Sequence, residues 1–168
     1  RRMFWLAVFG IGHAMLLWIG DILFFYAVVG MVAFLLRRVW LWLLFLLAAI
    51  CFAVPASLFL FLDQMSAADM QELSMMWSPS ADYIESTRAT YRGTWLGQVE
   101  LRYREWFGML GFLALFGWRI LANMLVGMAL FRMGVFAAER SDAAYKRMIW
   151  VGFVVGLPIC AYGVYDHD

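Results

Sequence analysis

Residues His13–Tyr26 read HAMLLWIGDILFFY and place a histidine, an aspartate and a tyrosine inside a long apolar run. The run extends from residue 3 to residue 36 without a lysine or arginine, and the pairs Arg1–Arg2 and Arg37–Arg38 stand at its two ends. One helix over this length would measure about 50 Å, whereas the hydrocarbon core of a bilayer is about 30 Å thick. Two shorter helices joined by a turn near residues 18–21 therefore fit the run better.

The residues at this turn suit a change of direction. Gly20 permits a tight backbone turn, and Asp21 is a residue type that suits the N-cap of the following helix. The turn brings both arginine pairs to the same side of a membrane, and the positive-inside rule assigns that side to the cytoplasm. We therefore expect the turn itself to lie on the outer side.

The composition of the chain is that of a membrane protein. Its residues are 65% hydrophobic, whereas soluble domains are about 45–50% apolar. With a net charge of +1 and only 15% charged residues, the chain shows no basic surface for nucleic acid. Cys51 and Cys160 lie far apart in apolar runs, so we expect two small buried side chains and neither a disulfide framework nor a metal site.

The hydropathy pattern predicts an all-α, polytopic transmembrane helix bundle that forms one membrane domain over residues 1–168. We expect five spans, with Pro55 kinking the third and Pro158 the fifth. The spans cover about residues 3–19, 21–36, 39–62, 107–131 and 148–165. Because the chain begins without methionine and ends just after an apolar run, we expect it to be part of a longer protein.

Residues 63–106 are polar enough to form an external helical loop. Ser66–Asp69 resembles a capping box, and an apolar helical face follows it until Pro79 ends the helix. A second helical pattern covers residues 80–106, where the members of one stripe are Ile84, Tyr91, Trp95 and Arg102. Two roles stay open for this loop, a lid packed on the spans or headgroups and a gate for substrate.

His13 and Asp21 are the candidate catalytic residues. The turn would bring the two side chains near each other, and a carboxylate can orient an imidazole for general-base catalysis or a proton relay. The alternative is structural: Asp21 caps its helix, and His13 is hydrogen-bonded to a neighbouring helix. The sequence leaves both readings open.

Four further residues are candidates for substrate binding. Arg119 lies near the middle of the fourth predicted span, with Asn123 one turn later on the same face, so the arginine has either a structural partner or an anionic ligand. Trp18 and Tyr26 are the other two. Their structural alternatives are a place in the outer aromatic belt for Trp18 and a hydroxyl bonded within the bundle for Tyr26.

Several ordered stretches carry a family resemblance. They are GHA at residues 12–14, LWIGDIL at residues 17–23, YRGTW at residues 91–95 leading to Arg102, and NMLVGMALFRMG at residues 123–134. Together they resemble YeiB-like bacterial inner-membrane proteins, whose shared C-terminal region has no known function. The resemblance implies a multi-pass protein of the bacterial inner (cytoplasmic) membrane, with further spans N-terminal to this chain.

The resemblance implies two functions of different classes. The N-terminal half of these proteins resembles membrane acyltransferases of the heparan-glucosaminide acetyltransferase type, so one hypothesis is transfer of an acyl group from an acyl-CoA-like donor to an envelope acceptor. Because the catalytic histidine of that superfamily belongs to the N-terminal half, its role does not transfer to His13. The second hypothesis is a small-solute transporter, and a non-catalytic scaffold remains a third. The expected partners are the lipid bilayer, the missing N-terminal spans and, as an open question, further copies of the protein.

Overall fold

The computed structural model describes residues 1–62, 66 and 78–165, and every regular element among them is helical. The prediction of an all-α fold is therefore confirmed for these residues. The chain divides into two compact units, Arg1–Met128 and Ala129–Asp168, which are considered separately below. The helix predicted after Ser66 lies outside the described residues.

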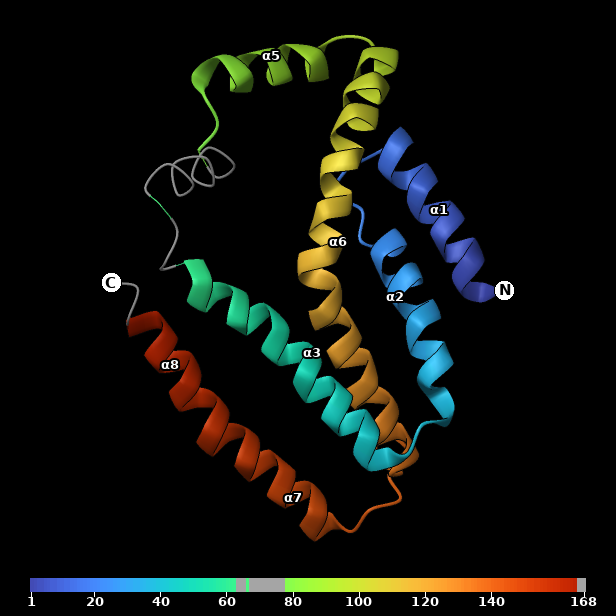
Figure 1. The fold of residues 1–168 in the computed structure, drawn as a ribbon, viewed down its shortest axis with the longest axis vertical. Helices are drawn as coiled ribbons and strands as arrows, with labels where there is room; N and C mark the ends of the chain where they lie inside the picture. Colours follow the sequence, from blue (N-terminus) through green and yellow to red (C-terminus); the bar gives the residue numbers. More distant parts are fainter. Residues whose placement is uncertain (63–65, 67–77, 166–168) are drawn as a thin grey trace. The chain divides into compact units, whose positions relative to one another are not determined.

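The first unit begins with an antiparallel helical hairpin. Helix α1 (Arg2–Leu16) and helix α2 (Leu23–Leu35) lie side by side (Figure 1), and the turn between them falls where the sequence predicted it. Gly10 allows the close approach, since a Cβ atom there would lie 2.5 Å from the backbone nitrogen of Phe24. A short 3-10 turn (Leu36–Arg38) follows α2. Both arginine pairs therefore stand at the same end of the hairpin.

Helix α3 (Leu41–Leu62) continues through Pro55 as one helical element. Among residues 41–57 of this helix, the buried residues are Leu44, Ala48 and Cys51, and their spacing of four and three places them on one face. The hydroxyl of Ser57 donates to the carbonyl of Val54 at 2.7 Å, within the turn that contains the proline. The expectation of a buried Cys51 is confirmed.

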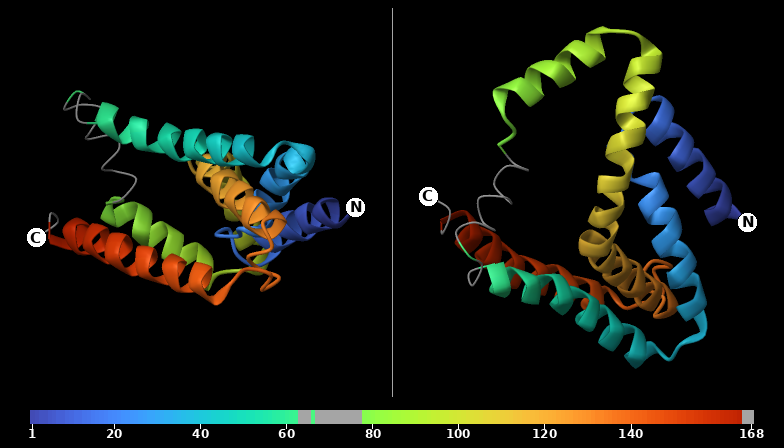
Figure 2. Two further views of the ribbon diagram at one scale, coloured as in Figure 1. Left: turned by 90° about the horizontal axis from the view of Figure 1, so that it is seen from below. Right: turned by 45° about the horizontal axis from the view of Figure 1, so that its top comes forward.

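Two helices build the rest of the first unit. Helix α5 (Ala81–Arg92) is capped by Ser80, whose hydroxyl accepts from the amide of Tyr83, and it ends at Gly93. Helix α6 (Trp95–Arg132) then runs from the predicted external loop through the predicted fourth span without a break at residue 106. Its stretches Trp95–Gly111 and Phe116–Arg132 meet at an angle of 65°. The right view of Figure 2 shows the first half of α6 beside the α1–α2 hairpin.

The contact between α5 and α6 is polar. The hydroxyl of Tyr83 donates to a carboxylate oxygen of Glu105 at 3.0 Å, and this hydrogen bond and the negative charge of Glu105 raise the pKa of Tyr83. At the corner between the helices, Thr94 Oγ1 accepts from the amide of Gly97. The break at Gly93 thus separates two helices where the sequence pattern suggested one weakened helix.

The second unit consists of the last turn of α6, a structured loop and one long helix. Gly134 (φ 73°) and Ala138 (φ 56°) adopt left-handed backbone conformations in the loop. Helix α7 (Asp142–Val151), a π-helical turn (Gly152–Gly156) and helix α8 (Leu157–Tyr165) then follow one another directly. A wider turn before Pro158 accommodates a residue that lacks a backbone N–H and whose ring crowds the preceding turn.

This long helix is exposed on all sides within its unit. The span window within Asp142–Tyr165 is 0% buried, and Trp150 is 70% exposed. Cys160, which we expected to be buried, is exposed, because the described elements of its unit leave every residue of α8 exposed. Gly152 and Gly156 form a GxxxG pattern, and a methyl group added at either position would likewise meet no atom within 4 Å.

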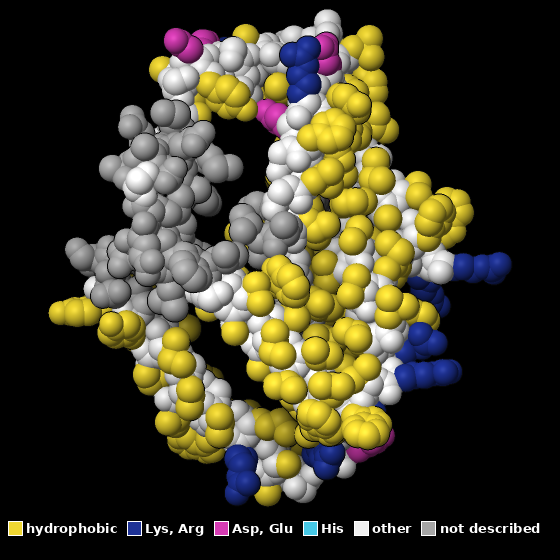
Figure 3. Space-filling model, in the orientation of Figure 1, with side chains coloured by type: hydrophobic (Ala, Val, Ile, Leu, Met, Phe, Trp, Pro, Cys, Tyr) yellow, Lys and Arg dark blue, Asp and Glu magenta, His cyan; other side chains and the backbone are white. Residues whose placement is uncertain are grey.

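By length and composition, one described helix can cross a membrane, namely Asp142–Tyr165. If the two stretches of α6 form one bent span, they provide a second membrane-crossing helix. Arg2–Leu16 and Leu41–Ser57 are apolar helices shorter than 18 residues. The five predicted spans are therefore not established. Figure 3 nevertheless shows hydrophobic side chains over most of the visible surface, with basic side chains projecting where α1 begins and α2 ends.

Candidate functional site

His13 and Asp21 meet at the turn of the hairpin. His13 Nδ1 lies 3.5 Å from Asp21 Oδ1, and the two side chains are 37% and 1% exposed. Nδ1 is itself buried and has no hydrogen-bond partner among the described residues. The accessible part of the His13 side chain therefore lies away from Asp21, while the nitrogen that faces the carboxylate is sealed from solvent.

Asp21 also serves the start of α2. Its two carboxylate oxygens accept from the amide of Leu23 at 3.0 and 3.2 Å. The N-cap position belongs to Ile22, so Asp21 stands one residue earlier than predicted but still satisfies one of the free amides of the first turn. Each of the two interpretations of Asp21 is thus supported by a contact. Capping is supported by the hydrogen bond from the Leu23 amide, and the catalytic role by the approach to His13.

The end of α1 is held by two residues of α6. The guanidinium of Arg102 donates to the carbonyls of Met15 (2.9 Å), Leu16 (3.1 Å) and Leu17 (3.3 Å). Trp95 Nε1 adds a bond to the carbonyl of Leu16 at 3.2 Å. These bonds satisfy carbonyls that have no partner within α1, and they fix the helix end that carries His13.

The two buried charges at the turn lie at helix ends of opposite sign. Arg102 is 2% exposed and lies at the carboxyl end of α1, which carries partial negative charge. Asp21 is equally buried and lies at the amino end of α2, which carries partial positive charge. The helix dipoles and backbone hydrogen bonds thus explain how two ionisable side chains can be buried here.

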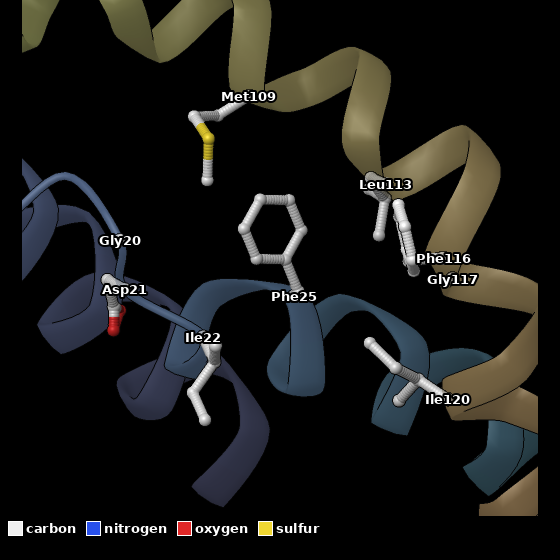
Figure 4. Close-up of a pocket in the computed structure, with 9 residues that line it drawn as sticks. All are labelled: Gly20, Asp21, Ile22, Phe25, Met109, Leu113, Phe116, Gly117 and Ile120. Atoms are coloured by element: carbon white, nitrogen blue, oxygen red, sulfur yellow. The ribbon is translucent and has the colours of Figure 1, made fainter. Parts of the chain in front are cut away.

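A cavity of about 260 Å³ lies between the start of α2 and the middle of α6 (Figure 4). Gly20, Asp21 and Gly117 contribute to its wall. The remaining lining is apolar and comes from Ile22, Phe25, Met109, Leu113, Phe116 and Ile120. Asp21 thus belongs both to this cavity and to the pair with His13.

The other predicted site residues do not join this cluster. Trp18 is exposed, with its ring over Gly20, and Tyr26 is exposed on α2; neither lines the cavity. Arg119 and Asn123 share a face of α6 as predicted, and the Asn123 amide donates to the carbonyl of Arg119 at 2.9 Å. Both are exposed and lie outside the cavity lining, so the first unit does not enclose Arg119.

Arg102 and Trp95 are the residues that sequence reasoning did not select as functional. The available signal was their place on the apolar stripe of residues 80–106, because an arginine on such a face needs buried acceptors. No group of three metal-binding side chains occurs in the part of the chain that the structure describes.

Comparison with known proteins gives one informative match. The chain is 29% identical over 172 residues to the uncharacterized protein YeiB of Escherichia coli (strain K12), across 95% of this chain and 43% of YeiB. The chain resembles YeiB. It spans less than half the length of that curated relative. No family model matches the chain, and no solved structure does. The predicted YeiB-like resemblance is therefore confirmed, and it brings no established activity with it.

Proposed function

We propose that the chain is part of a multi-pass protein of the bacterial inner membrane. The long helix Asp142–Tyr165 supports membrane insertion, as do exposed apolar side chains on the other helices. Large exposed apolar surfaces are rare in soluble monomers and typical of membrane contact. The similarity to YeiB of Escherichia coli supports the bacterial setting.

We propose further that this protein transfers an acyl group, with His13 as the general base. The observation that carries this proposal is the 3.5 Å approach of His13 Nδ1 to the buried carboxylate of Asp21. A carboxylate facing Nδ1 favours the tautomer with its proton on that nitrogen, which leaves the lone pair of Nε2 free. The distance is longer than a good hydrogen bond, and such contacts often tighten only when substrate binds.

The reaction follows from these roles. His13 Nε2 takes the proton of an acceptor hydroxyl, and the hydroxyl oxygen attacks the carbonyl carbon of an acyl thioester donor. The carbon–sulfur bond breaks, the thiolate leaves, and the imidazolium returns the proton to it. The products are an ester of the acceptor and a free thiol. Asp21 stabilises the imidazolium while the proton resides on His13.

Arg119 and Asn123 are proposed to bind the anionic end of the donor. A guanidinium holds phosphate or carboxylate through two parallel bonds, which suits an acyl-CoA-like molecule. Arg119 lies at most about 25 Å from Arg102 along α6, from the helical rise per residue. A donor that extends from His13, beside the helix end held by Arg102, to Arg119 must therefore be long, with its charged group remote from its thioester.

The test is an acyl-transfer assay with the full-length protein in liposomes, radiolabelled acyl-CoA and an envelope extract as acceptor. General-base catalysis contributes about 10²–10⁴-fold, so His13→Gln should lower the rate at least about a hundredfold. Ile11→Ala, a change on an exposed residue of the same helix, should leave it within about twofold. A folded His13→Gln protein with the wild-type rate would exclude this role. Solute uptake without any labelled product would instead favour the transporter.

A further inference from the structure

Four exposed arginines lie together at one end of the α1–α2 hairpin. One pair stands at the start of α1, and the other lies in the 3-10 turn after α2. The two helices are in contact at this end, since a Cβ atom at Gly30 would lie 2.8 Å from Sδ of Met3. Figure 3 shows basic side chains projecting there. This arginine cluster consists of Arg1, Arg2, Arg37 and Arg38.

The positive charge of the arginine cluster is not neutralised by carboxylates. In the part of the chain that the structure describes, no ion pair joins any of the four arginines to an acid. The only acidic residue in α1, α2, α3 and their connections is Asp21, at the opposite end of the hairpin. Two arginines on α5 and α6 instead form ion pairs, Arg88 with Glu85 and Arg104 with Glu100. The cluster therefore suits an anionic partner from outside the described residues.

Arg37 is held in a position that leaves most of its donors available. Its guanidinium carbon lies 3.8 Å from the centroid of the Phe34 ring, and Nη1 donates to the Phe34 carbonyl at 3.1 Å. A guanidinium carries five N–H donors, and no other acceptor for Arg37 occurs among the described residues. Two parallel N–H groups of a guanidinium match the oxygens of a phosphate. The ring and the carbonyl thus orient a side chain whose remaining donors suit a phosphate.

Exposed aromatic rings follow each arginine pair along the chain. The sequence reads RRMFW at residues 1–5 and RRVWLW at residues 37–42, and in both the first exposed ring comes two residues after the second arginine. These rings belong to Phe4, Trp5, Trp40 and Trp42. Tryptophan concentrates at the headgroup level of a bilayer, between the polar surface and the acyl chains. The order of cation, aromatic ring and aliphatic side chain therefore matches the order of phosphate, interface and hydrocarbon across one leaflet.

We propose that the arginine cluster binds the headgroup of an anionic phospholipid, an inference that rests on the membrane location proposed above. The positive-inside rule orients a chain in the membrane, but it predicts no preference for one lipid. Uncompensated guanidinium groups beside aromatic rings favour a headgroup with a net negative charge over a zwitterionic one. Each basic side chain near an anionic surface strengthens binding by about fivefold.

Native mass spectrometry of the full-length protein in detergent tests the proposal, with phosphatidylglycerol and phosphatidylcholine as probes. The wild type should bind phosphatidylglycerol at least about tenfold more tightly. The double variant Arg37→Gln with Arg38→Gln should weaken that binding at least about tenfold, from about fivefold for each arginine. The control Arg88→Gln with Arg104→Gln removes the same charge from ion-paired positions and should stay within about threefold. Equal affinity for the two lipids, or an equal loss in both double variants, would overturn the proposal.

Photolabelling of the wild-type protein covers the case in which the glutamine variant does not fold. The probe is phosphatidylglycerol with a diazirine in its headgroup, in liposomes that contain the full-length protein. Peptides that contain Trp5 or Trp40 should carry at least about fivefold more label than the α5 peptide that contains Tyr83. Label concentrated in α5 would contradict the proposal. Complete displacement by millimolar inorganic phosphate would also contradict it, because the arginines would then bind a soluble anion.

The outcomes separate this inference from the membrane location on which it rests. A full-length protein that stays in the membrane fraction but shows no preference for phosphatidylglycerol would retain the location and remove the lipid site. A full-length protein recovered in the soluble fraction of cells would remove the location itself, whatever lipid it binds in detergent.

Discussion

Asp21 has two contacts, and two substitutions separate them. Asp21→Ala removes the acceptor for the Leu23 amide and should lower the free energy of unfolding by about 1 kcal/mol, the usual loss for a helix-capping side chain. Asp21→Asn keeps an oxygen for that amide, so its stability should stay within about 0.5 kcal/mol of wild type. Thermal unfolding of the full-length protein in detergent measures both. If Asn destabilises as much as Ala, the capping contact is not what Asp21 contributes to stability.

The same pair of variants informs on catalysis. Asparagine carries no charge to stabilise protonated His13. If Asp21 assists catalysis in addition to capping α2, the Asp21→Asn protein should therefore be stable but should lose acyl transfer. A stable Asn variant with full activity would leave Asp21 as a capping residue only.

Arg102 is expected to be the most important single polar residue for the first unit. Arg102→Met leaves the carbonyls of Met15, Leu16 and Leu17 without their charged donor, so we expect a loss of about 2–4 kcal/mol in the free energy of unfolding. Arg104, two residues later on α6, is the matched control, because its ion pair with Glu100 is exposed. Arg104→Met should change stability by less than about 1 kcal/mol. Chemical unfolding in mixed detergent gives both values.

Arg102→Lys separates charge from geometry. An ammonium group keeps the positive charge at the end of α1 but cannot present the planar set of donors that reaches three successive carbonyls. Its stability should fall between those of wild type and Arg102→Met. Full stability of the lysine variant would mean that charge alone holds the helix end.

At the scale of elements, the approach of α1 to α2 depends on one glycine. A methyl group at Gly10 would lie 2.5 Å from the nitrogen and 2.9 Å from the Cα of Phe24, atoms of a helix backbone that cannot move alone. Gly10→Ala should therefore separate the helices and cost about 1–3 kcal/mol. Gly12→Ala is the control, since nothing lies within 4 Å there, and better helix propensity should add up to about 1 kcal/mol. Thermal unfolding that ranks the two variants equally would refute the close packing.

Helix α6 connects the features of the candidate site. Its first turns hold the end of α1 through Trp95 and Arg102, and its middle supplies Met109 and Leu113 to the cavity. A change that displaces α6 should therefore affect His13 and the cavity together. Since α6 crosses the predicted boundary at residue 106, residues 95–106 of the predicted external loop and the predicted fourth span belong to one helix in this site.

At the scale of the whole molecule, the features that could be predicted from the sequence are those that depend on the pattern of neighbouring residues. Helical content, the turn near Gly20 and the proximity of His13 to Asp21 follow from run length, turn residues and chain reversal. The contacts of Arg102 could not be derived, because they join residues 85 to 87 positions apart and depend on how α6 lies against α1. The burial expected for Cys160 failed for a similar reason, because hydrophobicity does not reveal whether a helix has a protein neighbour.

Membrane topology is the remaining prediction for the whole molecule. The positive-inside rule assigns Ser78 to the exterior and the loop after α6 to the cytoplasm. In the full-length protein with Cys51 and Cys160 replaced by alanine, Ser78→Cys should react with an impermeant maleimide on intact cells. Ala137→Cys should react only after permeabilisation, and it avoids Ser141, whose hydroxyl caps α7. We expect at least a tenfold difference in labelling between the two sites on intact cells. Labelling of Ala137→Cys from outside would reverse the assigned orientation, and with it the expectation that the turn between α1 and α2 lies on the outer side.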